Sequence, residues 1–139
     1  MALVTREKFL ATLRDPGGMP EAEIARIGGL WPGASAAAQE ALGRMPGIGF
    51  LSPRRRAEAF VALCAELDRA AAQQGLTQEQ CQLALAILRL SAARMRKAEA
   101  GFLARLSRLD GPARDALPET AKHFLYSIHL LQNPDTSGR

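Results

Sequence analysis

Few residues in this sequence have the type and spacing that catalysis or metal binding requires. His123 and His129 are six positions apart, whereas two metal ligands on one helix face stand three or four apart. Cys64 and Cys81 fall on apolar helix faces, which is typical of reduced structural cysteines. No serine or cysteine is marked as a nucleophile by a tight turn, and no glycine-rich loop follows a strand. We therefore expect a protein that is not an enzyme and that binds no metal or cofactor.

The segment FLSPRRR, residues 50–56, is the first candidate interaction site. Ser52 can cap a helix, and Pro53 suits the first helical position. The three arginines then stand where the helix macrodipole disfavours cations by about 0.3–1 kcal/mol each, and a pair between Arg54 and Glu58 offsets only part of this cost. Arginine beside an aromatic anchor is typical of protein interfaces. The alternative is that Phe50 and Leu51, the two apolar residues before Ser52, cover the core. We predict a docking surface for a larger protein partner at Phe50, Leu51, Arg54, Arg55 and Arg56.

A second candidate site comes from the distribution of charge. The chain has a net charge of +4, and residues 76–109 alone carry six basic and two acidic side chains. At about 100° per residue, four of these cations fall on one helix face around Gly101 and Ala104, where a phosphate backbone could approach closely. Two interpretations of this face stay open. It binds nucleic acid independently of sequence, for instance as a small subunit of a ribonucleoprotein, or it is only a solvated face. The cations of this basic strip are Arg94, Lys97, Arg105 and Arg108.

Length and composition indicate a single soluble domain. A chain of 139 residues can bury one core, and we expect it to span residues 1–133, with a disordered tail at 134–139. Charges at positions 6–8 interrupt any secretory signal. The longest apolar run, residues 83–88, is far shorter than the roughly 20 residues that cross a bilayer. The sequence therefore predicts a cytoplasmic protein without a membrane segment, and it does not indicate an oligomeric state.

Helix signals recur along the chain, whereas the alternating pattern and β-branched residues of strands are nearly absent. We predict an all-α bundle of five or six helices with one long central helix. Thr77 and Gln80 have the spacing of a capping box at the start of that helix. Apolar residues recur every seven positions along it, at Cys81, Leu88, Met95, Phe102 and Leu109. The predicted helices cover about residues 5–14, 20–28, 35–44, 53–74, 77–109 and 118–132.

Residues 20–43 resemble a helix-turn-helix, but their connection departs from that motif. The segment GGLWPGA is longer than the usual turn of three or four residues and contains Pro32. The second helix is nearly all alanine, with Gln39 as the one side chain suited to reading bases. We expect an Ala-rich helix packed closely on a neighbour. Trp31, between the two short helices, suggests a third function, a regulator that binds a small ligand.

Overall fold

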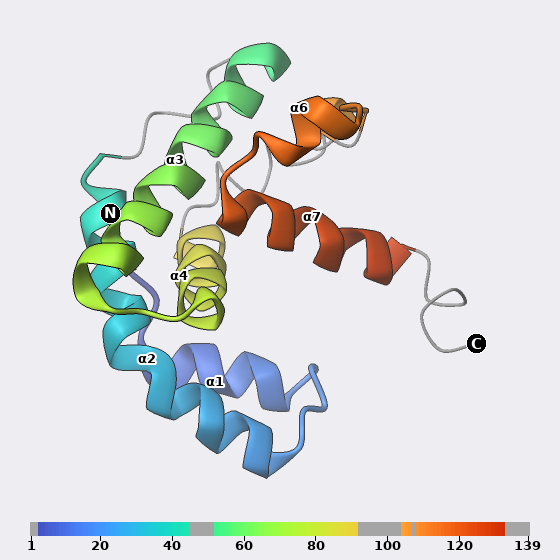
Figure 1. Cartoon of the computed structure of the whole chain (residues 1–139). Coiled ribbons are helices and arrows are strands. Elements are labelled where there is room, and N and C mark those ends of the chain that lie inside the picture. Colours follow the sequence, from blue (N-terminus) through green and yellow to red (C-terminus); the bar gives the residue numbers. More distant parts are fainter. Residues whose placement is uncertain (1–2, 45–51, 92–103, 107, 133–139) are drawn as a thin grey trace.

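The computed structural model describes residues 3–44, 52–91, 104–106 and 108–132, and these segments contain helices and no strand (Figure 1). The predicted all-α class is confirmed. Residues 134–139 lie outside the described segments, so the predicted tail stays a prediction. The helices with defined bounds are α1 (Arg6–Arg14), α2 (Glu21–Leu42), α3 (Pro53–Gln74), α4 (Gln78–Ser91), α6 (Gly111–Asp115) and α7 (Glu119–Gln132).

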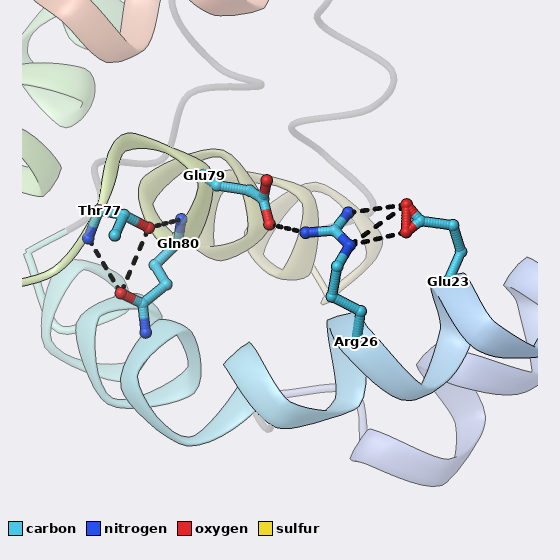
Figure 2. A network of polar contacts seen from close by, with 5 residues as sticks. All are labelled: Glu23, Arg26, Thr77, Glu79 and Gln80. Atoms are coloured by element: carbon cyan, nitrogen blue, oxygen red, sulfur yellow. Dashed lines mark hydrogen bonds and ion pairs between the residues drawn. The ribbon is translucent and has the colours of Figure 1, made fainter.

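Side-chain caps fix the starts of three helices as the sequence predicts. The hydroxyl of Thr5 accepts a hydrogen bond from the third amide of α1 at 3.2 Å, and Ser52 does the same for α3 at 3.3 Å. At the start of α4, the Thr77 hydroxyl accepts from the Gln80 amide at 3.2 Å, and the Thr77 amide donates to Gln80 Oε1 at 2.9 Å (Figure 2). This reciprocal pair is the predicted capping box.

Helix α2 corrects the prediction of two short helices, because it runs unbroken from Glu21 to Leu42 with Pro32 inside it. Proline has no N–H, so the carbonyl of Gly28, four residues earlier, loses its helical donor. The Nε of Arg6 in α1 donates to that carbonyl at 3.4 Å. Gly28 permits this approach, since a Cβ there would lie 2.6 Å from the Arg6 guanidinium. The neighbouring helix thus replaces the donor that Pro32 lacks.

Helix α2 packs mainly on α4, and its alanine-rich half lies in the core. Gly33 lets the two helices approach, because a Cβ there would stand 2.8 Å from Leu76 and 2.9 Å from Gln80. The sequence predicts close packing of this half on a neighbouring helix. A continuous α2 also removes the turn that a helix-turn-helix requires. The buried alanines are Ala34, Ala37, Ala38 and Ala41.

The apolar faces of α3, α4 and α7 meet in one core. The rings of Phe60 and Phe124 join α3 to α7 with centroids 5.1 Å apart. In α4, Ile87 and Leu88 are fully buried, whereas Leu90 is 36% exposed. The predicted long helix is confirmed only as far as Ser91, where α4 ends. Residues 92–103, with Met95 and Phe102, lie outside the described segments. The buried face of α3 comprises Phe60, Leu63, Cys64, Leu67, Ala70 and Ala71.

The start of α7 is held by a buried polar junction that the sequence did not reveal. Thr120 is completely buried, and its hydroxyl donates to the Asp68 carboxylate of α3. The Thr120 amide donates to the same carboxylate at 3.3 Å. From α4, Gln78 Nε2 donates to the Thr120 hydroxyl at 3.1 Å and Gln82 Nε2 to the Thr120 carbonyl at 2.8 Å. These bonds satisfy the buried groups and fix α7 against two helices.

A short helix, α6, lies where the sequence predicts only a chain break. The side chain of Asp110 accepts from the Ala113 amide at 3.0 Å, and Pro112 stands in the first turn. The sequence DGP at residues 110–112 therefore begins a helix, in addition to following the end of the predicted helix at residue 109. Among the described helices, none combines the length and apolar character needed to cross a bilayer.

Candidate interaction surface

The first turn of α3 presents its arginines to solvent. Arg54 and Arg55 are exposed and Arg56 is half-buried. The Arg54 guanidinium contacts Glu58 at 3.5 Å, the pair predicted from the sequence, and 78% of the Arg54 side chain remains exposed. Ser52 already caps the helix, so its start gains nothing from these cations. Phe50 and Leu51, the apolar part of the predicted docking surface, lie outside the described residues.

The basic strip is described only in its second half. Arg105 and Arg108 are exposed, and the Arg108 amide donates to the Arg105 carbonyl at 3.2 Å in a turn. Within the described segments neither guanidinium has an ion pair. Arg94 and Lys97 lie outside those segments. The strip as a whole therefore stays a prediction.

The described parts of the two candidate sites are drawn toward the same end of the molecule (Figure 1). In Figure 1 the first turn of α3 and the segment carrying residues 104–106 and α6 are both drawn at the top. Residues 52–58 and 104–115 together carry six arginines and three carboxylates, a charge of +3 within the net +4 of the chain. We call these two segments the cationic end. Each of the two segments thus carries a net positive charge of its own.

Other arginines are held by carboxylates. Arg14 contacts Glu21 through two nitrogens at 2.6 and 3.1 Å. Arg26 bridges Glu23 in its own helix and Glu79 in α4 (Figure 2). These contacts raise the pKa of Arg26 and lower that of Glu23, chiefly through the hydrogen bonds between the two side chains. Arg44 and Arg69 share Glu66 in the same manner. We call Arg14, Arg26, Arg44 and Arg69 the paired arginines.

The two cysteines are placed as core residues. Cys64 and Cys81 are buried, and desolvation raises the pKa of both thiols. The Cys81 thiol donates to the Leu67 carbonyl at 3.7 Å. A thiol with a raised pKa is a poor nucleophile and a poor metal ligand. In the segments described, no group of three or more His, Cys, Asp or Glu side chains is arranged to hold a metal ion.

Trp31 belongs to the core. Its ring packs against Phe9 of α1 with centroids 5.4 Å apart, and the residue is 8% exposed. The predicted third function, ligand binding at Trp31, stays a prediction. Comparison with known proteins adds no functional information, since no family model, curated protein or solved structure matches the chain.

Proposed function

We propose that this protein is a non-enzymatic helical interaction module that docks on a larger protein through its cationic end. The observation that carries the proposal is the exposure of Arg54 and Arg55 in the first turn of α3. Both cations oppose the dipole of their helix, at a cost of about 0.3–1 kcal/mol each. The exposed contact between Arg54 and Glu58 offsets little of this cost. A binding role accounts for charges that weaken their own helix.

The charge of this region specifies the kind of partner surface. A region of net +3 favours an acidic surface and accelerates association with it at low salt. Arginine suits such an interface because its planar guanidinium binds carboxylates through two parallel hydrogen bonds. Phe50 and Leu51, next to Ser52 in the sequence, would supply the apolar anchor of the interface.

Nucleic-acid binding is the second candidate, favoured by the exposure of Arg105 and Arg108 at the same end. Phosphates would take the place of partner carboxylates, and binding would depend steeply on salt. Stacking platforms of aromatic side chains, common among single-strand binders, are not found among the exposed residues of the described segments. We therefore place this candidate second.

The test is affinity capture of the tagged protein from its host, with and without nuclease. A protein partner that survives nuclease and is lost from the Arg54→Gln/Arg55→Gln variant supports docking. Loss of every partner on nuclease treatment supports the second candidate. Arg14→Gln/Arg26→Gln is the matched control, since it removes the same charge from the paired arginines. Equal loss of capture in both variants contradicts docking through the cationic end.

A further inference from the structure

A hollow of about 160 Å³ opens between the C-terminal end of α2 and the second half of α3. Its lining includes three buried alanines, Ala37 and Ala41 from α2 and Ala70 from α3. The space exists because both helices carry methyl groups where longer side chains would fill it. A space of this size can hold several water molecules or a small ligand.

The polar lining of the hollow carries charges of both signs, which are joined in ion pairs. Arg44 Nη1 and Arg69 Nη1 each contact the Glu66 carboxylate at 2.6 Å. Arg44 also contacts Glu40, at 3.7 Å, which is too long for a hydrogen bond. These two arginines and two glutamates sum to zero charge. Glu66, with a pKa lowered chiefly by its hydrogen bond to Arg44, holds the two guanidiniums beside one another.

Donors and acceptors remain available around this hollow. A guanidinium has five N–H groups, and the contacts within the described segments engage one group of Arg69 and two of Arg44. Among the described residues, the carboxylate of Glu40 has only its long contact with Arg44. The amide of Gln73, which also lines the hollow, has no hydrogen-bond partner in the described part of the chain.

We propose that this hollow binds a small zwitterion, an amino acid head group whose ammonium and carboxylate are attached to one carbon atom. The carboxylate would lie on Arg69 and the Gln73 amide of α3. The ammonium would lie on Glu40, near the C-terminal end of α2, where the helix dipole favours a cation. A neutral lining with both signs matches a ligand of the same kind, and an anion alone would face Glu40 and Glu66. The alanines leave room for a small side chain only.

The probe for this site is glycine, followed by NMR through the backbone amides of Ala41 and Ala70 and the side-chain amide of Gln73. Titration with glycine should shift these signals to saturation. Sodium acetate and methylammonium chloride, which each carry half of the zwitterion, should shift them far less at matched ionic strength. No shift with glycine, or equal shifts with acetate, overturns the proposal.

Variants distinguish glycine binding in the hollow from weak contact of glycine with the rest of the surface. Arg69→Gln removes a charge-assisted hydrogen bond and should weaken glycine binding about tenfold. Gln73→Ala, a change at an exposed position, should also weaken it. Arg14→Gln is the matched control, because it breaks a comparable ion pair between α1 and α2, and it should leave binding unchanged. Equal binding in Arg69→Gln and Arg14→Gln shows that glycine does not occupy the hollow.

Discussion

The corner between α1 and α2 and the start of α3 use arginine in opposite ways. At the corner, Arg14 stands in the last turn of α1 and Glu21 in the first turn of α2. Each charge suits the dipole of its own helix, and Nε lies 2.6 Å from the carboxylate. At the start of α3, Arg54 and Arg55 oppose the dipole, and Arg54 meets Glu58 only at 3.5 Å. Charge at the corner supports the fold, whereas charge at the start of α3 does not.

The same contrast separates the two arginine groups. Three of the paired arginines join helices, since Arg14 links α1 to α2, Arg26 links α2 to α4 and Arg44 links the end of α2 to α3. The cationic end carries six of the chain's arginines against three carboxylates. We infer that stability depends on the packed contacts between helices and that the exposed arginines of the cationic end contribute little to it.

The largest expected loss of stability comes from the core between α2, α3 and α4. Leu88→Ala should lower the free energy of unfolding by about 2–5 kcal/mol, because Leu88 is fully buried and its truncation leaves a cavity. Leu90→Ala, two residues on in the same helix, is the matched control, with a side chain 36% exposed. Urea denaturation should show a loss for Leu90→Ala well under half as large. Equal losses would mean that the packing of α4 is not as described.

The next effect tests how α2 continues through Pro32. Arg6→Ala should lower stability by about 1–3 kcal/mol, because the Gly28 carbonyl loses its donor. In a Pro32→Ala background the helix regains its own N–H, so the same Arg6 substitution should cost much less. A double-mutant cycle by urea denaturation measures this coupling. Additive effects would contradict the replacement of the proline N–H by Arg6.

A smaller effect appears in the pH dependence. Contacts with Arg44 and Arg69 lower the pKa of Glu66 below its usual 4.5 in the folded protein. Such a carboxylate stabilises the fold above about pH 4.5, and this contribution disappears as the pH falls through the lowered pKa. Glu66→Gln should therefore be less stable than the wild type at neutral pH, and the difference should vanish in acid. A difference independent of pH would show that the glutamate acts through packing alone.

Much of the fold follows from local signals in the sequence. Thr5, Ser52 and Thr77 cap their helices as predicted, and α3 ends before Gly75 as expected. These features depend on neighbouring residues, so spacing is enough to find them. The continuity of α2 depends instead on Arg6, which is 22 positions away from Gly28. No local pattern contains that donor, and Pro32 therefore predicted a break.

The sequence predicts which charged residues form the candidate site, but it does not predict where they lie relative to one another in the fold. Arg54 and Arg55 were singled out because their charge conflicts with the helix dipole, and they are exposed. The sequence could not show where the segment carrying residues 104–106 and α6 lies relative to the first turn of α3, since this depends on how the helices pack. The hollow was missed for the same reason. Its residues, such as Ala41 and Ala70, stand far apart in the chain and look like ordinary helix formers.

The most direct measurement of the central claim compares the urea midpoints of two variants with equal numbers of Arg→Gln changes. One changes the exposed cations Arg54, Arg55, Arg105 and Arg108, and the other changes the paired arginines Arg14, Arg26, Arg44 and Arg69. The paired set should lose about 0.2–1 kcal/mol per broken pair. The cationic-end variant should keep the wild-type midpoint or exceed it slightly, because a conflict with the dipole of α3 is relieved. A cationic-end variant destabilised as much as the paired set would contradict the account.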